Sequence, residues 1–335
     1  LGKPTSAELC RVAKKSYPEE LDVYPWPDRT TFDMDSYATY TRHSSRRTEG
    51  RDGTRLATMT ASRGCPFKCT FCSSKNFWGA VIRHRDYREV VAEMKHLHDE
   101  HGINTFVFND DNIMFDRRWV IELANEIIRQ GLEIRWSSGG GIQASSMKPD
   151  VIQALHESGV RWFGLALESG NAKTLRRILK PLSGKDGQAA QIIADIRKYP
   201  DVWIGSNFVT GFHFETEDDI LENHRYAGGL DLDWRSFFSF MAFPGSEDFE
   251  NCVEAGYIDR DAIWQDDEVG KLITLSTENF SAERVSHLNY LANLEHNFLK
   301  NRNLSANPDQ AIRDFNYVIE FVSDHAFAFL GRGMA

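Results

Sequence analysis

Apolar and polar residues follow two different periods along this chain, and the two periods take turns from residue 56 onward. Six short runs are rich in β-branched and aromatic residues and are bounded by polar or glycine-containing segments, a pattern that predicts strands. The predicted strands are 56–64, 103–109, 132–138, 160–167, 202–209 and 234–243. Between them apolar residues recur on one helical face, so the chain is predicted to alternate strand and helix.

The helical segments carry start and stop signals of their own. One helix is predicted to begin at a capping-box pair, Asp86 and Glu89, and to end at Gly102, because these residue types cap helix N- and C-termini. Pro149 is suited to the first position of another helix, and Thr216 is suited to cap the last. The other helical patterns cover 119–131, 150–159, 172–179 and 188–199.

Strands that alternate with helices at this spacing predict parallel βαβ units with the helices on the outside. Six such units favour an α/β fold built as an open, partial (β/α)6 TIM-like barrel over the closed eight-unit barrel. A flat, doubly wound sheet is the alternative, and periodicity alone does not separate the two. In both architectures the functional residues are expected at the C-terminal ends of the strands.

Two less regular pieces flank this body. Residues 1–55 are polar, with three prolines between 18 and 27, and are predicted to be an N-terminal extension or linker. Residues 56–246 form the predicted core. Residues 247–335 contain helical patterns such as 284–302 and are predicted to be a mainly helical C-terminal region.

Composition and charge narrow the class of protein. The chain has 335 residues, is 41% hydrophobic and has no apolar run long enough for a membrane span, which predicts a soluble protein. Its net charge of −10 repels phosphate backbones and so disfavours nucleic acid as a partner. The first 30 residues contain no signal-peptide core, so a cytoplasmic location is expected; the first residue is Leu, which is typical of a fragment or a processed protein.

Three of the five cysteines, Cys65, Cys69 and Cys72, lie together in the segment SRGCPFKCTFC. This bunching is unlike the evenly spaced framework of a disulfide scaffold. Three thiolates on one loop suit a soft metal centre. Zinc would normally require a fourth protein ligand, for which His84 is the candidate, and three unrelated core cysteines are the plain structural alternative. The remaining interpretation is a four-iron cluster with one iron open to an outside ligand.

The spacing Cys65-x-x-x-Cys69-x-x-Cys72 resembles the signature of the radical S-adenosylmethionine (SAM) superfamily, with Phe71 as the aromatic residue before the last cysteine. The resemblance covers roughly residues 56–246, and the order of strands and helices is that of the family's six-unit partial barrel. Three later segments also resemble family motifs in the expected order: FNDDNIMF (108–115), LALESGN (165–171) and NFVTGFHFETEDD (207–219).

The resemblance implies a set of cofactor contacts. The three cysteines would hold a [4Fe-4S] cluster, and Phe71 would contact SAM through its backbone. One carboxylate of the pair Asp110 and Asp111 would bind the amino group of SAM, and a helix-capping role is the alternative for Asp111. Glu168 and Ser169 would contact the methionine or ribose part, and Asn207 opens the fifth-strand motif. For Glu168 the alternative is a salt bridge with Arg83 or Arg85.

The resemblance also implies the chemistry. The cluster would pass one electron to SAM and cleave its sulfur–carbon bond, giving a 5′-deoxyadenosyl radical that abstracts hydrogen from a small-molecule or peptide substrate. An electron donor such as flavodoxin or ferredoxin would be the protein partner. Two segments depart from the family pattern. His213 replaces a proline, and it could be a substrate ligand, a proton donor or a hydrogen-bonded loop histidine. The segment SSGGGIQ (137–143) is rich in glycine, which suits close approach of the backbone to a ligand.

A finer resemblance is to the cobalamin-associated branch of the superfamily. Residues 23–37 are similar to the linker that follows the cobalamin domain in that branch, but the sequence contains no Asp-x-His-x-x-Gly segment and no complete domain before residue 56. Cobalamin therefore stays open as a third cofactor. With it, the reaction implied is C-methylation by a methyltransferase. Without it, rearrangement, dehydration, epimerisation or cyclisation are implied. Transfer-RNA methylthiolation and a non-catalytic, metal-stabilised binding module also stay open.

Overall fold

The computed structural model describes residues 17–43, 53–180, 187–261 and 275–335. Among these residues, two three-stranded parallel sheets follow the chain order, β1–β4–β5 and β6–β7–β8. The strands are β1 Leu56–Met59, β4 Thr105–Phe108, β5 Arg135–Ser138, β6 Trp162–Glu168, β7 Trp203–Thr210 and β8 Trp234–Ser239. All six of these strands therefore lie within their predicted ranges or end one residue beyond them.

Ile142 joins the two sheets into one curved wall. It pairs in parallel with Leu165, its N–H donates to the carbonyl oxygen of Gly164 at 2.6 Å, and its carbonyl oxygen accepts from the N–H of Ala166 at 2.9 Å. The hydrogen-bonded order is thus the order of the chain from β1 to β8. A doubly wound sheet would reverse direction partway, so the partial barrel is confirmed and the flat alternative is wrong.

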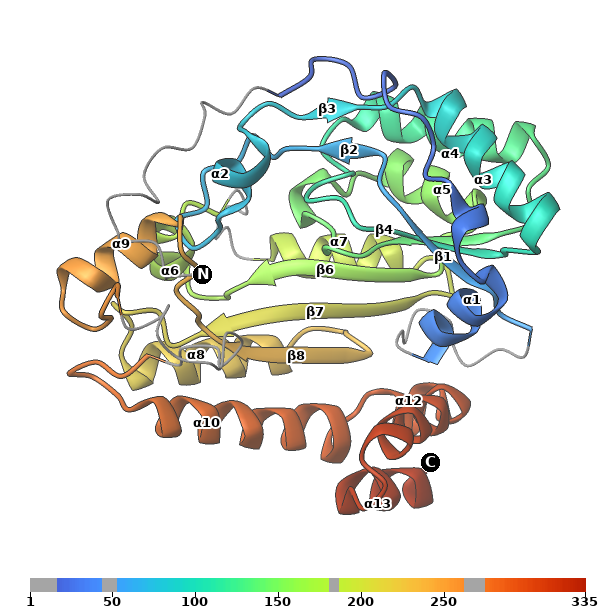
Figure 1. Ribbon diagram of the computed structural model, residues 1–335. Helices are drawn as coiled ribbons and strands as arrows, with labels where there is room; N and C mark the ends of the chain where they lie inside the picture. The colour runs from blue at the N-terminus through green and yellow to red at the C-terminus, as the bar shows by residue number, and fades with distance from the viewer. Residues whose placement is uncertain (1–16, 44–52, 181–186, 262–274) are drawn as a thin grey trace.

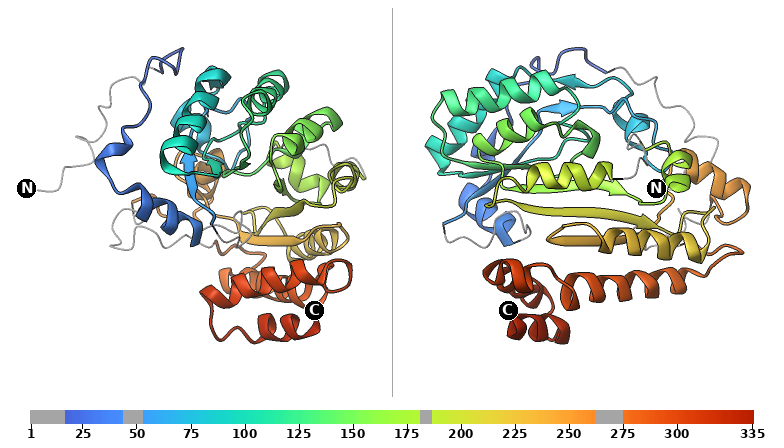
Figure 2. Two further views of the ribbon diagram at one scale, coloured as in Figure 1. Left: turned by 90° about the vertical axis from the view of Figure 1, so that its right-hand side faces the viewer. Right: turned by 180° about the vertical axis from the view of Figure 1, so that it is seen from behind.

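The helices form an outer layer around this wall (Figures 1 and 2). The helices of the βαβ units are α3 Tyr87–His101, α4 Arg117–Arg129, α5 Pro149–Glu157, α6 Ala172–Arg177, α7 Gln188–Ile196 and α8 Glu217–Gly228. Phe163, Leu165 and Leu167 of β6 pack against this layer in one apolar cluster. Because side chains alternate along a strand, Gly164 and Ala166 face the concave side of the wall, up to the register shift that precedes Glu168.

Most of the local signals act as predicted. Asp86 caps α3, but its carboxylate accepts from the N–H of Arg88 and not from that of Glu89, so the predicted capping box is wrong there. Gly102 ends that helix in the left-handed conformation. Pro149 is the first residue of α5. Thr216 and Asp219 form a reciprocal capping box at the start of α8. Each signal acts within a few residues, so the three-dimensional context does not override it.

The first predicted strand is wrong in its second half. β1 ends at Met59, and Ser62–Arg63 form a separate strand, β2, which pairs antiparallel with β3, Arg83–His84. The break occurs because the carboxylate of Asp110 accepts hydrogen bonds from the N–H groups of Ala61 and Ser62 and draws the chain away from the sheet. The hairpin formed by β2 and β3 encloses the cysteine loop and the short helix α2, Ser74–Trp78.

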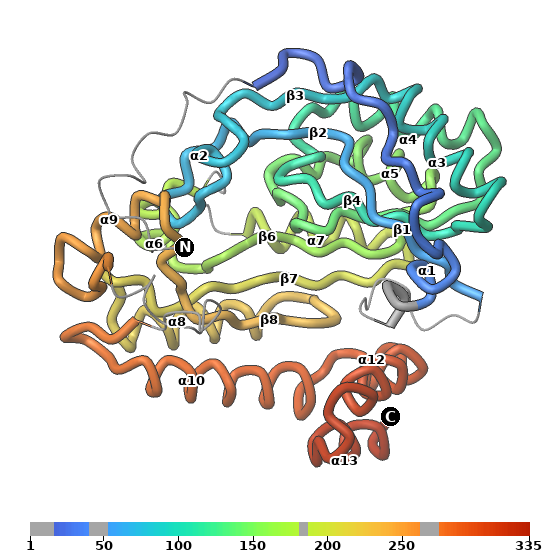
Figure 3. The backbone as a smooth tube through the Cα atoms, in the orientation of Figure 1, coloured from blue at the N-terminus to red at the C-terminus, as the bar shows by residue number. Residues whose placement is uncertain are grey.

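The described part of the N-terminal segment runs along the outside of β1 and α3 (Figure 3). It contains the 3-10 turn Arg29–Thr31 and helix α1, Met34–His43. The guanidinium of Arg29 lies 2.8 Å from the carboxylate of Glu93 on α3, and the hydroxyl of Tyr37 lies 2.7 Å from that of Thr58 on β1. This segment is therefore fastened to the core by polar side chains.

Helices follow the last strand to the end of the chain, as predicted. They are α9 Glu247–Glu254, α10 Ala282–Leu294, a π-helical turn Glu295–Leu299, α11 Asn303–Ala306, α12 Pro308–Phe321 and α13 Ala326–Met334. α10 runs along β8 (Figure 1), and Trp203 and Trp234 at the starts of their strands pack with Phe298 and Phe315. In the described ranges no helix is long and apolar enough to cross a membrane.

Candidate active site

The cysteine loop lies between β2 and α2 and is held at several points. The N–H of Cys65 donates to the carbonyl of Gly79 at 3.3 Å, and the N–H of Cys72 donates to the carbonyl of Cys69 at 3.2 Å. Thr70 is buried between the cysteines; its N–H donates to Ile178 and its hydroxyl donates to the carboxylate of Asp248 at 2.7 Å. The loop is therefore fixed by partners from α6 and α9, far away in sequence.

The three thiols share one electrostatic environment. Burial raises the pKa of Cys69 to about 11, Lys180 opposes the shift, and Cys72, Glu168 and Cys65 add to it. Burial also raises the pKa of Cys72, the N–H of Ser74 opposes that rise, and Cys65 and Asp111 add to it. Thiols that disfavour each other's ionisation lie near one another, and a bound cation is what would turn them into thiolate ligands.

The geometry separates the two metal interpretations. Within the described ranges, no three Cys, His, Asp or Glu side chains converge tightly enough to hold a single ion. His84, the expected fourth zinc ligand, stacks on Trp119 with ring centroids 4.6 Å apart. The zinc interpretation with His84 is therefore not supported. Three thiols that are neighbours without meeting at one point fit a group larger than one ion, such as an iron–sulfur cluster.

Glu168 and Lys180 form a buried ion pair beside the thiols. The ammonium of Lys180 lies 2.9 Å from the carboxylate of Glu168, and the two side chains are 6% and 11% exposed. Glu168 ends β6 with a left-handed backbone, φ 65°, at a position where the strand register shifts. The expected alternative partners, Arg83 and Arg85, bind elsewhere: Arg83 donates to backbone carbonyls and Arg85 pairs with Glu93.

The two neighbouring aspartates play different parts. Asp110 is buried and accepts from two backbone N–H groups and from the hydroxyl of Ser62, while burial raises its pKa to about 6. Asp111 is exposed and close enough to Cys72 to raise its pKa. The carboxylate that caps the following helix, α4, belongs to Asp116, so the helix-capping alternative for Asp111 is wrong.

The segment after β6 is clamped to β7. The side chain of Asn223 on α8 accepts from the N–H of Gly170 at 2.9 Å and donates to the carbonyls of Glu168 and Val209. The hydroxyl of Ser169 is buried and accepts from the N–H of Asn171 at 3.1 Å. This network holds the backbone of Glu168 in its left-handed conformation at the mouth of the barrel.

Asn207 and Phe71 lie on different sides of the site. Asn207 is exposed in the middle of β7, although β6 and β8 flank that strand, so the concave face of the barrel is open to water at this point. The ring of Phe71 packs edge-on against Phe212, with centroids 5.8 Å apart, in a second apolar cluster. Phe71 thus anchors the cysteine loop to the loop after β7.

The glycine-rich segment after β5 brings backbone close to backbone. A side chain at Gly140 would stand 2.7 Å from the carbonyl oxygen of Asp110, and one at Gly139 would stand 3.1 Å from that of Phe108. At these two glycines the backbone therefore approaches the end of β4, and not a ligand as expected.

His213, in the loop after β7, is 12% exposed, and its Nδ1 lies 3.9 Å from the carboxylate of Asp248.

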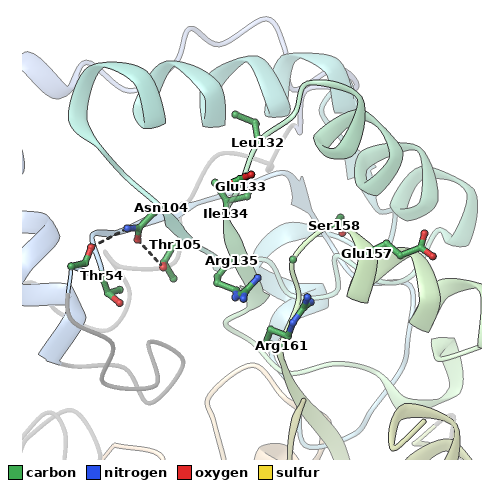
Figure 4. A pocket seen from close by; sticks show the side chains of 12 residues that line it. Thr54, Asn104, Thr105, Leu132, Glu133, Ile134, Arg135, Glu157, Ser158 and Arg161 are labelled. Carbon is green, nitrogen blue, oxygen red and sulfur yellow. Dashed lines mark hydrogen bonds between the residues drawn. The ribbon is translucent and has the colours of Figure 1, made fainter. Parts of the chain in front are cut away.

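A cavity of about 500 Å³ lies at the other end of the barrel. Residues at the starts of β4, β5 and β6 line it, among them Thr105 and Arg135 (Figure 4). Active sites of βα barrels lie at the C-terminal ends of the strands, where the cysteine loop, Asp111 and Glu168 are found. The candidate active site therefore lies at the opposite end of the barrel from this cavity.

Glu215, in the loop that enters α8, is expected to make the unfolding free energy of the protein depend on pH. Its carboxylate is fully buried, and burial raises its pKa from an ordinary 4.5 to about 7, although the N–H groups of Gly211 and Phe212 and the hydroxyl of Thr174 bind it. The folded protein therefore holds a proton that the unfolded chain has released. This contribution to stability is complete below pH 4.5 and is lost as the pH rises through 7.

The unfolding free energy of the wild type is expected to fall between pH 4.5 and pH 8, and Glu215 accounts for about 3 kcal/mol of this fall. In Glu215→Gln we expect the fall to be smaller by that amount. Urea unfolding curves at both pH values measure it. Glu217→Gln, at a partly exposed carboxylate that begins α8, is the control and is expected to leave the pH dependence as in the wild type. An equal pH dependence in Glu215→Gln and wild type would contradict the assignment.

Three residues of the site carry no recognisable signal in the sequence. Lys180 lies close to Arg176 and Arg177 in the sequence and does not stand out from them. Asp248 lies outside the predicted core, and Asn223 lies within a helical pattern that gives no sign of its role. Each acquires its place through a partner at least 12 residues away: Glu168 for Lys180, Thr70 for Asp248, and Gly170 for Asn223. The sequence indicated a cation near Glu168 only through the alternative salt bridge, which it assigned to Arg83 or Arg85.

Known proteins resemble this chain across the same region. A family model described as the Radical SAM superfamily matches residues 59–227. Cytidylyl-2-hydroxyethylphosphonate methyltransferase of Streptomyces wedmorensis is 28% identical over 287 residues, which cover 79% of this chain and 52% of that protein. The chain thus spans about half the length of this relative.

Two solved structures share the fold. The cobalamin-dependent SAM radical enzyme OxsB, solved with aqua-cobalamin and SAM, superposes with a TM-score of 0.58 and 11% identity, over 82% of this chain and 46% of that one. The radical SAM methyltransferase TsrM from Kitasatospora setae, solved with cobalamin and a [4Fe-4S] cluster, gives a TM-score of 0.54 and 17% identity, over 61% and 41%. At such identities the likeness establishes the fold.

Proposed function

This chain belongs to the radical SAM superfamily, and on that premise we propose that it is an enzyme in which Cys65, Cys69 and Cys72 hold a [4Fe-4S] cluster at the mouth of a partial barrel. When bound, the cluster and SAM supply a one-electron cleavage that yields a 5′-deoxyadenosyl radical. The substrate is a small molecule or peptide that loses a hydrogen atom. The observation that carries this proposal is the set of three mutually interacting thiols beside the buried Glu168–Lys180 pair.

The chain's own residues would first have to make thiolates. Binding a cluster removes the thiol protons; burial raises the pKa of Cys69 and Cys72 and so disfavours this step, and Lys180 opposes the shift at both. Its charge is kept close to the thiols by Glu168, since a buried ammonium needs a hydrogen-bonded partner. Thr70 and Asp248 keep the loop in the shape that brings the sulfurs together.

The same residues offer contacts for SAM. Asp111 is exposed beside Cys72, so we assign it the amino group of SAM by a charge-assisted hydrogen bond. Asp110 is saturated by three donors and serves to hold the strand–loop junction. Glu168 and Ser169 remain our assignment for the ribose or methionine part, and Phe71 for a backbone contact. Asn207 faces the open concave side, where substrate would approach.

The reaction subtype that we propose is methyl transfer to carbon. Its support is the methyltransferase relative and the two cobalamin-associated folds. The sequence contains no Asp-x-His-x-x-Gly segment, so its residues offer no recognisable lower ligand for cobalamin, and no step proposed above depends on it. The donor of the electron would be a flavodoxin or ferredoxin, and we place the enzyme in the cytoplasm.

Anaerobic purification and turnover test the function. We expect about four irons and four sulfides per chain, and release of 5′-deoxyadenosine when SAM and dithionite are added. One zinc per chain without iron, or iron without any cleavage of SAM, would contradict the proposal. The subtype has a separate test: methylcobalamin retained by the full-length protein, with labelled methyl groups transferred from SAM to a carbon, is expected, and cleavage with no methyl product would contradict methyl transfer only.

A further inference from the structure

The segment around the cysteine loop has an unusual charge. From residue 53 to residue 85 the chain contains no Asp or Glu but six basic residues, in a protein whose net charge is −10. The six are Arg55, Arg63, Lys68, Lys75, Arg83 and Arg85. This segment therefore carries a net charge of +6, while the rest of the chain carries −16.

Four of these cations keep their charge uncompensated. Arg55 pairs with Asp35, and Arg85 pairs with Glu93 and Asp22. In the described ranges, Arg63, Lys68, Lys75 and Arg83 have no carboxylate within ion-pair distance. Two of them rest on aromatic rings instead: the guanidinium of Arg63 lies 5.0 Å from the ring centre of Trp78, and that of Arg83 lies 4.8 Å from that of Tyr17.

Two apolar side chains project from the same region. Phe77 on α2 is 63% exposed, and Val81, just before β3, is 71% exposed. The backbone beneath them is fixed, because the carbonyl of Phe77 accepts from the hydroxyl of Tyr17 at 3.2 Å and that of Trp78 accepts from Arg83 at 2.6 Å. An exposed apolar pair on a fixed backbone, within a basic surround, is typical of an interaction site.

This region is close to the cysteines. The N–H of Ser74, the first residue of α2, lies 3.5 Å from the sulfur of Cys72. A helix of five residues is about 7.5 Å long. Phe77 therefore lies within about one short helix of the sulfur of Cys72, on α2 (Figure 1).

We propose that Arg63, Lys68, Lys75, Phe77, Val81 and Arg83, here named the α2 surface, dock an acidic one-electron carrier protein of the flavodoxin type. The inference rests on the proposed function, which requires an electron to reach the cysteine loop from outside. Charge complementarity selects the partner: uncompensated cations steer a negatively charged protein and raise its association rate, while the acidic remainder of the molecule repels it. Electron-transfer contacts are small, so an apolar pair with a basic rim is sufficient.

The test compares Lys75→Glu with Lys198→Glu. Both substitutions change the net charge by −2, but Lys198 lies just after α7, at the opposite end of the barrel from α2. Release of 5′-deoxyadenosine is measured at low salt with reduced flavodoxin and, separately, with dithionite. We expect Lys75→Glu to lower the flavodoxin-driven rate at least tenfold and to leave the dithionite-driven rate unchanged, Lys198→Glu to alter neither, and Phe77→Ser to behave like Lys75→Glu.

Binding of oxidised flavodoxin to the cluster-loaded protein is measured as well, because it does not depend on turnover. Weaker binding by Lys75→Glu and a loss of wild-type binding with rising salt support the proposal. Equal flavodoxin binding by Lys75→Glu and wild type overturns it, as does binding of nucleic acid or self-association that Lys75→Glu abolishes while flavodoxin does not bind. Failure of the wild type to cleave SAM with dithionite contradicts the proposed function instead, and the binding measurement still decides the docking surface.

Discussion

Cys69→Ala is expected to abolish the release of 5′-deoxyadenosine and to reduce the iron content from about four to less than one per chain. Cys69 is the central thiol of the loop, and its ionisation is coupled to Cys72, Cys65, Glu168 and Lys180. A cluster held by three thiolates loses a corner when one is removed, and the remaining two ligands do not retain it. Iron and sulfide analysis after anaerobic reconstitution measures the first effect, and product release with dithionite the second.

Cys252→Ala is the matched control for Cys69→Ala. Cys252 is fully buried in the second apolar cluster, so the same atoms are removed from a structural position. We expect it to bind iron and cleave SAM like the wild type, with an unfolding free energy lower by about 1 kcal/mol. Full turnover by Cys69→Ala would show that the cysteine motif does not hold the cluster.

Lys180→Met is expected to lower the unfolding free energy by about 3–5 kcal/mol and to prevent cluster retention. The substitution leaves the carboxylate of Glu168 buried without its partner at 2.9 Å, and it removes the cation that opposes the raised pKa values of Cys69 and Cys72. Urea unfolding and iron content per chain measure the two effects. Unchanged stability and unchanged iron in Lys180→Met would contradict the role of the pair.

The double variant Lys180→Met with Glu168→Gln separates stability from chemistry. Replacing a buried ion pair by uncharged side chains of similar size is often neutral for stability, so most of the lost free energy is expected to return. Cluster retention is expected to stay low, because the cation is still absent. Lys173→Met is the control for removing an ion pair as such: its partner is Asp219, the lysine is exposed, and a cost below about 1 kcal/mol is expected.

The order of the elements was predictable because its signals are local. Strand and helix periods, the cap at Asp86, the proline at the start of α5 and the capping box at Thr216 all act within one or two helical turns. The cysteine motif is local too, since its three members span eight residues. The split of the first strand was not predictable, because Asp110, 48 residues after Ser62, ends it.

The candidate site was predictable only in part, and for the same reason. Asp110 and Asp111 are neighbours with the same side chain, so the sequence does not show which of them is open to a ligand. The structure shows it, because Asp110 is buried at the end of β4 and Asp111 is exposed. The alternative salt bridge of Glu168 was assigned to Arg83 or Arg85, but its partner is Lys180, because the turn after α6 brings this lysine beside the cysteine loop.

The sequence by itself therefore determined the family, the alternation that builds a six-stranded partial barrel and the three cysteines at its mouth. The tertiary structure alone decided the buried pair beside the thiols, the hydrogen bond between Thr70 and Asp248 across 178 residues, and which cations of residues 53–85 have a carboxylate partner among the described residues. The physical reason is range: hydrogen-bonded periods and caps are set by neighbours in the chain, whereas burial and charge pairing are set by neighbours in space.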